Sequence, residues 1–159
     1  MSEIKVGVAD YAVARGEVML VTVGLGSCVA IAMHDPVRQV GGLAHVLLPD
    51  EGLARDTANA AKFATTAVPL LLQEMRELGA GRELAAKLVG GASMFRQLLK
   101  SGGINIGERN ISSARRILAE AGVPLAAEDV GGEHGRTVYF NTRTGQVLVR
   151  SLMAGDRVL

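Results

Sequence analysis

Short apolar runs separated by turn residues occupy most of the sequence. The runs are rich in Val, Ile, Leu and Ala, and the chain contains 20 glycines, which suit tight turns. Runs of this length between such residues predict β-strands. The predicted strands span residues 4–13, 17–23, 28–35, 40–49, 84–89, 125–130, 137–142 and 146–153. A chain divided in this way builds its core mainly from paired strands.

Two longer segments have the periodicity of amphipathic helices. The first runs from about Asp56 to Leu78, and Pro69 inside it predicts either a kink or a division into two helices. The second spans Gly107 to Ala121 and is ended by Gly122 and Pro124. Both helices have one apolar side, which must be buried against another element.

The order of these elements indicates the fold class. Residues 94–100 offer a further short helical segment, but strands and helices do not alternate regularly as they do in repeated β-α-β units. The sequence therefore predicts an α/β fold with mixed, largely antiparallel sheets and with the helices packed outside. Because the composition does not shift along the chain, residues 1–159 are expected to form a single domain.

Composition argues against several classes of protein. Hydrophobic residues make up 48% of the chain and charged residues 21%, as in ordinary globular domains, and the near absence of aromatic residues predicts an aliphatic core. Lys and Arg total 17 against 16 Asp and Glu, and they are scattered, which argues against a nucleic-acid-binding protein. We see neither an apolar run long enough to span a membrane nor a secretory signal, and we expect a cytoplasmic protein.

The single cysteine is the first candidate for chemistry. Cys28 has no partner for an internal disulfide, so it is either a core residue or a reactive thiol. If Asp35 to Arg38 form a turn, the flanking strands pair so that Cys28 lies opposite His45. An adjacent imidazole can take the thiol proton and create a nucleophile. Both interpretations stay open, because a one-residue change in register would turn one side chain to the other face.

The residues before Cys28 suit a reactive thiol. Glycines in Gly24-Leu25-Gly26-Ser27 allow a substrate to approach the backbone closely, and N–H groups around Gly26 and Ser27 are candidates to bind a developing oxyanion. A third residue should orient the imidazole of His45. Thr22 is the best local candidate, because the only acidic residue between it and His45 is Asp35, at the hairpin tip.

These motifs resemble the CheD family. The resemblance rests on TVGLGSCV at residues 22–29 and GGLAHVLLP at residues 41–49, and it extends over KLVGGASMF, IGERN, DVGG and GRTVYF to cover nearly the whole chain. CheD is the chemoreceptor glutamine deamidase of bacterial and archaeal chemotaxis. The resemblance implies a catalytic triad of Cys28, His45 and Thr22 in an α/β sandwich similar to the catalytic domain of cytotoxic necrotizing factor toxins.

The resemblance also implies a reaction and partners. Cys28 would attack the carboxamide of a receptor glutamine, ammonia would leave, and water would hydrolyse the thioester to glutamate, without a metal or organic cofactor. The CheC phosphatase, which acts on phosphorylated CheY, is the implied regulator. One alternative is a non-catalytic adaptor that binds CheC or receptors. Another is a cysteine protease or transglutaminase, which would use the same thiol and imidazole.

Other positions attract simpler interpretations. His34 and His134 are expected to be surface residues, because three scattered histidines make a weak case for zinc. Residues 90–92 are expected to form a tight turn, because no Gly-Lys-Ser/Thr follows them as in a phosphate-binding loop. Arg115 and Arg116 are expected to lie on a solvated helix face.

Overall fold

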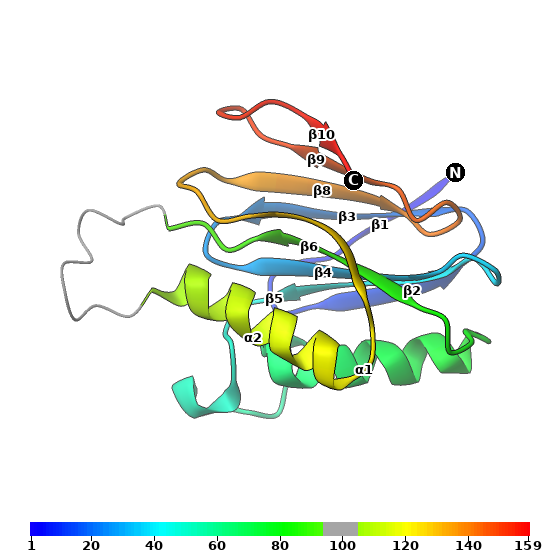
Figure 1. The fold of residues 1–159 in the computed structure, drawn as a ribbon, viewed down its shortest axis with the longest axis horizontal. Helices are drawn as coiled ribbons and strands as arrows, with labels where there is room; N and C mark the ends of the chain where they lie inside the picture. Colours follow the sequence, from blue (N-terminus) through cyan, green and yellow to red (C-terminus); the bar gives the residue numbers. More distant parts are fainter. Residues whose placement is uncertain (94–104) are drawn as a thin grey trace.

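The computed structural model describes residues 1–93 and 105–159, and it consists of two stacked β-sheets with helices beneath the second (Figure 1). Sheet A has the order β1 (Ser2–Lys5), β3 (Val18–Leu25), β8 (Arg136–Asn141), β9 (Val147–Arg150) and β10 (Arg157–Val158). Sheet B has the order β2 (Tyr11–Arg15), β5 (Val40–Val46), β4 (Val29–Asp35), β6 (Ala85–Gly90) and β7 (Leu125–Val130). The helical segments are α1 (Ala64–Glu77), α2 (Ile106–Glu120) and two single 3-10 turns (Glu51–Leu53 and Ala60–Lys62).

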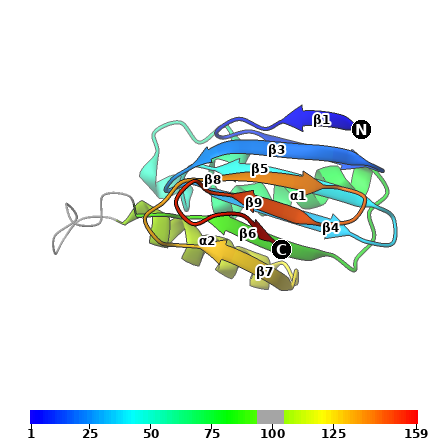
Figure 2. The ribbon, with the colours of Figure 1, turned by 90° about the horizontal axis from the view of Figure 1, so that it is seen from above.

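The predicted fold class is confirmed. Only the pairs β1–β3 and β6–β7 are parallel, and the other strand pairs of the described residues are antiparallel. Seen from above, sheet A lies over sheet B and the helices lie below (Figure 2). Both described α-helices pack on the outer face of sheet B.

Two apolar cores follow from the alternation of side chains along the central strands. One face of β4 and β5 packs against the helices, through residues such as Ile31, Ala44 and Leu71. The other face meets sheet A, through residues such as Ala30, Leu43 and Phe140. All seven residues of β5 are therefore buried, and a polar residue on this strand lies in the interior.

The first predicted strand is wrong, because residues 4–13 form parts of two strands. The segment pairs with β3 at Ser2–Lys5, leaves the sheet, and pairs with β5 at Tyr11–Arg15. Ala9 has a positive φ of 58°, and its N–H donates to the carbonyl of His45. The chain thus crosses from sheet A to sheet B, and this crossing runs past the site described below.

The first helix is shorter than predicted and continues through Pro69. Residues 56–63 are not α-helical, because Phe63 is fully buried in an extended conformation and pairs with Leu48. Pro69 lies on the exposed side of α1, where the backbone hydrogen bond that proline removes is lost next to solvent.

The last predicted strand is also too long. It ends at Arg150, and a turn leads to the short strand β10. The second predicted helix agrees with α2 to within one residue at each end. The short helix proposed for residues 94–100 lies outside the described residues.

Candidate functional site

Thr22 and His45 meet between the two sheets. Thr22 comes from β3 of sheet A and His45 from β5 of sheet B, and both side chains are fully buried. The Oγ1 atom of Thr22 lies 2.6 Å from Nδ1 of His45 and 2.6 Å from the carbonyl oxygen of Val6. The structure therefore brings together the two residues that the sequence singled out on neighbouring strands of different sheets.

The carbonyl of Val6 determines the tautomer of His45. A threonine hydroxyl carries one proton, and a carbonyl can only accept a hydrogen bond. Because Thr22 donates this proton to Val6, its oxygen must accept from Nδ1–H of His45. The other ring nitrogen, Nε2, then has a free lone pair, and it makes no hydrogen bond within the described residues. His45 is thus arranged as a base at Nε2.

Cys28 lies beside His45 on the same face of sheet B, but the predicted register is wrong by two residues. His45 pairs with Ala30, not with Cys28, which precedes the first residue of β4. A shift of two residues keeps a side chain on the same face of a sheet. Cys28 and Ala30 accordingly belong to the same core cluster between the sheets, and Cys28 is placed diagonally from His45.

The hairpin turn explains the difference. The loop consists of residues 36–39, since Asp35 pairs with Val40 as the last pair of the ladder. The Asp35 carboxylate accepts hydrogen bonds from the N–H groups of Val37 and Arg38, and Gln39 has a positive φ of 55°. The turn therefore starts one residue later than expected, which changes every pairing in the hairpin by two.

Burial favours the neutral form of both the Cys28 thiol and the His45 imidazole. It raises the pKa of the Cys28 thiol above its ordinary value, and it lowers the pKa of the His45 imidazole. A neutral thiol is a proton donor and a neutral imidazole a proton acceptor, and the two groups lie diagonally on the same face of sheet B. The arrangement can thus generate a thiolate by transfer of one proton when a substrate enters.

The backbone at residues 26–28 is held by hydrogen bonds from two other segments of the chain. The N–H of Gly91 donates to the carbonyl of Cys28 at 2.8 Å, and the N–H of Ala92 donates to that of Gly26 at 2.8 Å. The side chain of Asn110 donates to the carbonyl of Ser27 at 2.9 Å. The carbonyl groups of these three residues are therefore engaged with the protein, and the loop that delivers the thiol is fixed.

Two contributors to the site were missed in the sequence. The Val6 carbonyl is a backbone group, which every residue has, so the sequence does not distinguish it. Asn110 did leave a signal, because it is a polar residue on the side of α2 that carries Ile111, Ala114 and Leu118 into the core. An asparagine at such a position predicts a buried hydrogen-bonding role.

Comparison with known proteins agrees with these motifs. The family described as CheD chemotactic sensory transduction matches residues 47–151. A relative from Clostridium novyi (strain NT) is 46% identical over 99% of this chain and 98% of its own length. One from Pyrococcus abyssi (strain GE5 / Orsay) is 49% identical over 97% of this chain and 94% of its own length. The chain belongs to the CheD family.

The names of these relatives describe an enzyme, and one solved structure is similar to part of the chain. Both CheD relatives carry the name probable chemoreceptor glutamine deamidase CheD. The crystal structure of Bacillus licheniformis hypothetical protein YfiH has a TM-score of 0.42 and 17% identity to this CheD chain. It covers 69% of this chain and 45% of the other.

Several residues of this CheD chain outside the site differ in part from the sequence expectations. His34 is half-buried and bonds through Nε2 to the Thr142 carbonyl, so it is less exposed than expected. Within residues 1–93 and 105–159, no three His, Cys, Asp or Glu side chains gather as a metal site would require. Gly90 and Gly91 have positive φ, but Gly90 is the last residue of β6 and the N–H groups of Gly91 and Ala92 donate to Cys28 and Gly26, so the expected tight turn is not closed by a hydrogen bond. Arg115 forms a two-bond contact with Glu128 of β7 and so ties α2 to the sheet.

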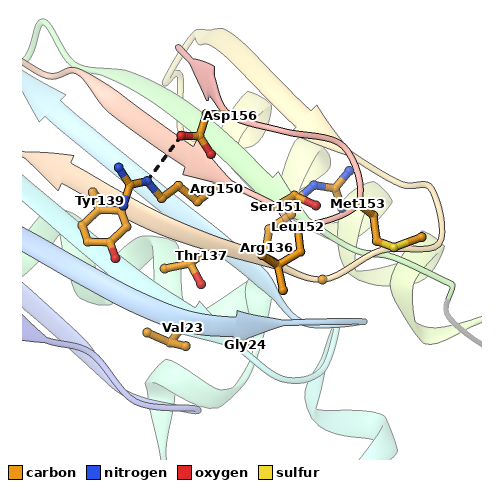
Figure 3. A pocket seen from close by; sticks show the side chains of 11 residues that line it. Val23, Gly24, Arg136, Thr137, Tyr139, Arg150, Ser151, Leu152, Met153 and Asp156 are labelled. Carbon is orange, nitrogen blue, oxygen red and sulfur yellow. Dashed lines mark ion pairs between the residues drawn. The ribbon is translucent and has the colours of Figure 1, made fainter.

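A hollow of about 480 Å³ lies on the outer face of sheet A (Figure 3). Exposed apolar side chains of Val23, Leu152 and Met153 line it, together with Tyr139 and an ion pair between Arg150 and Asp156. None of Thr22, Cys28 and His45 lines it. Since side chains alternate along β3, Thr22 faces the inter-sheet site while Val23 faces this hollow.

In the described part of the chain, no helix is long and apolar enough to cross a membrane.

Proposed function

We propose that this protein hydrolyses glutamine side chains of chemoreceptors to glutamate and ammonia, with Cys28 as nucleophile, His45 as base and Thr22 as the residue that orients His45. The observation that carries the proposal is the contact between Thr22 and Nδ1 of His45, which leaves Nε2 unprotonated on the face that Cys28 shares. The names of the CheD relatives supply the substrate class.

The first half of the reaction removes ammonia. The proton of the Cys28 thiol passes to Nε2 of His45, and the sulfur attacks the carboxamide carbon of the glutamine. The carbonyl oxygen takes up negative charge, for which backbone N–H groups around Gly26 and Ser27 are the donors we propose. His45 then returns the proton to the leaving nitrogen as the C–N bond breaks. Ammonia and a thioester on Cys28 result.

The second half consumes water. His45 takes a proton from a water molecule, which attacks the thioester carbon, and the C–S bond breaks. The proton on His45 then restores the thiol of Cys28. Glutamine and water have become glutamate and ammonia, and the steps use only side chains, backbone groups and water. Thr22 contributes in both halves, because it keeps Nε2 directed at the reacting atoms while the ring gains and loses its proton.

The proposal also covers the cellular compartment of the protein and its partners. A catalytic cysteine must stay reduced, and Cys28 is the only cysteine of the chain. No second thiol of the chain could therefore restore it by disulfide exchange after oxidation. We therefore place the protein in the reducing cytoplasm and propose that residues 1–159 act as one deamidase domain. Chemoreceptors are the proposed substrates and CheC the proposed regulator.

The test is incubation of the protein with a purified cytoplasmic fragment of a chemoreceptor. Mass spectrometry should show glutamine residues converted to glutamate, and the solution should contain ammonia in equal amount. Cys28→Ala and His45→Ala should abolish both, whereas His34→Ala, which removes a half-buried histidine outside the site, should retain them. Absence of conversion by the folded wild-type protein would contradict the proposal. Chain cleavage or amine incorporation would identify a protease or a transglutaminase, and unchanged signalling by Cys28→Ala would identify an adaptor.

A further inference from the structure

Asn110 connects the segments that carry the two reacting residues. It lies in the first half of α2 and is fully buried. Its Nδ2 atom donates one hydrogen bond to the carbonyl of Ser27 at 2.9 Å and another to the carbonyl of Leu47 at 3.1 Å. Because both partners are carbonyl oxygens, the nitrogen of the amide must face them. Ser27 precedes Cys28 by one residue, and Leu47 follows His45 by two.

These bonds occur where the strand ladder ends. The last pair between β4 and β5 on this side is Val29 with Val46. Beyond it, the N–H of Leu47 donates to the carbonyl of Lys62, so the chain turns away from β4. Cys28 therefore lies outside the β4–β5 pairing, and on the other side its carbonyl accepts a hydrogen bond from the N–H of Gly91. The side chain of Asn110 bridges the two diverging segments at this point.

The helix that supplies Asn110 is itself firmly placed. Ile111, Ala114 and Leu118 of α2 are buried in the core beneath sheet B. Gly107 packs against the backbone of Gly91 and Ala92 so closely that no side chain would fit there. The buried side of α2 and its close backbone contact thus hold the Asn110 amide against both segments.

We propose that Asn110 is a positioning residue for the proposed deamidation, acting by fixing the separation between Cys28 and His45. The inference rests on the proposed function and names a further residue for it. Among the described residues, Asn110 forms no hydrogen bond with the thiol or the imidazole, so it acts through the backbone that delivers them. Asparagine suits the position because its amide supplies two donors. An aspartate would place a carboxylate against two carbonyl oxygens, and an alanine would supply no donor.

Ser113 is a matched control for Asn110. It lies one turn further along α2, it is also buried, and its hydroxyl donates to the carbonyl of Pro49 at 2.8 Å. It therefore makes the same kind of bond, from the same helix to the same segment after β5. It has no bond to the loop before Cys28. A purely structural role for Asn110 predicts similar effects for both substitutions.

The deciding measurement is the pH dependence of Cys28 alkylation by iodoacetamide in the wild type, Asn110→Ala and Ser113→Ala. Loss of the Asn110 bonds should loosen the loop on the side that faces Leu47 and admit water there, although the bonds from Gly91 and Ala92 remain. The midpoint should therefore fall toward the value of a free thiol, about 8.5. Ser113→Ala should keep the wild-type midpoint. An unchanged midpoint in Asn110→Ala, or an equal change in both variants, overturns the proposal. If Asn110→Ala does not fold, Asn110→Ser, which retains one donor, takes its place.

Deamidation of the receptor fragment provides the second readout. Asn110→Ala should lower kcat by about 10- to 100-fold, as expected when reacting groups are misplaced, with little change in KM. Thiol reactivity should thus rise while activity falls, which simple unfolding would not produce in a variant that melts cooperatively. If the wild type fails to deamidate receptors, the proposed function fails, but the alkylation midpoints still decide whether Asn110 positions Cys28.

Discussion

The hydroxyl of Thr22 lies 2.6 Å from Nδ1 of His45 and donates its only proton to the carbonyl of Val6. This chain of two hydrogen bonds assigns the imidazole proton to Nδ1 and leaves Nε2 available as a base. The orientation depends on a bond between different sheets, so it exists only in the folded protein.

Replacing Thr22 by valine tests this role. Valine has nearly the same shape but no hydroxyl, so Nδ1–H of His45 would lose its acceptor, at a stability cost of about 1–3 kcal/mol for an unsatisfied buried group. We expect kcat for receptor deamidation to fall by about 10- to 100-fold through loss of orientation. Thr22→Ser keeps the hydroxyl and should retain most of the activity. Equal rates for the valine and serine variants would contradict the role assigned to Thr22.

Local patterns in the sequence were enough to predict most elements and to single out three residues that the fold brings to the same inter-sheet region. Alternating or continuous apolar runs identified the strands around Cys28 and His45, and the periodicity of residues 107–121 identified α2. Thr22 was found because it lies just before the glycine-containing turn. Its side chain and those of Cys28 and His45 all face the space between the sheets, which the period of two along each strand makes predictable.

The rest depended on contacts between distant segments. The hairpin register was missed because the Asp35 side chain binds the turn backbone and Gln39 adopts a positive φ, neither of which a residue count can show. Residues 6–10, where the chain crosses between the sheets, include Gly7 and Asp10, but these residues do not predict a change of sheet. The contact of the Val6 carbonyl with Thr22 therefore could not be predicted. Asn110 approaches Ser27 from 83 positions away. Such pairings follow from the topology of the folded chain.

The pKa of the Cys28 thiol should show its burial directly. Burial disfavours the thiolate, so the folded protein should alkylate with a midpoint above that of an ordinary thiol, about 8.5. Because Cys28 is the only cysteine, mass spectrometry of the whole protein reports on this one group. The urea-unfolded chain should return to the ordinary midpoint. A plateau of reactivity at neutral pH would instead indicate a preformed thiolate–imidazolium pair in the free protein.

The stability of the protein should depend on pH through His45. Its pKa is lowered by burial, so the unfolded chain binds the proton first as the pH falls below about 6.5. The stability contributed by the neutral imidazole is complete above that value and is lost as the pH falls toward the lower pKa of the folded state. His45→Gln has no such titration, although it should be the less stable protein at neutral pH.

Urea unfolding of both proteins at pH of about 7.5 and about 5 measures this difference. The gap in unfolding free energy between the wild type and His45→Gln should narrow at the lower pH. His34, whose pKa is also lowered by burial, is present in both proteins, so its contribution cancels. A gap that stays constant or widens on acidification would contradict a neutral, buried His45.

Gly90 should tolerate no side chain, because it combines backbone strain with a close approach to the backbone of Cys28. Its φ is 109°, and a Cβ atom there would overlap the carbonyl oxygen of Cys28, which is a backbone atom and cannot rotate away. Gly16 separates the two effects, since its φ is 83° but a Cβ atom would meet nothing within 4 Å.

We therefore expect Gly16→Ala to lose about 1–2 kcal/mol from the unfavourable φ, and Gly90→Ala to lose about 1–3 kcal/mol more from overlap. Only Gly90→Ala should also change the rate of Cys28 alkylation, because relief of the overlap must move the Cys28 backbone. Urea unfolding and alkylation of the two variants measure both effects. Equal stability losses with unchanged alkylation would show that the end of β6 can move without displacing Cys28. Gly90 would then not fix the position of the thiol.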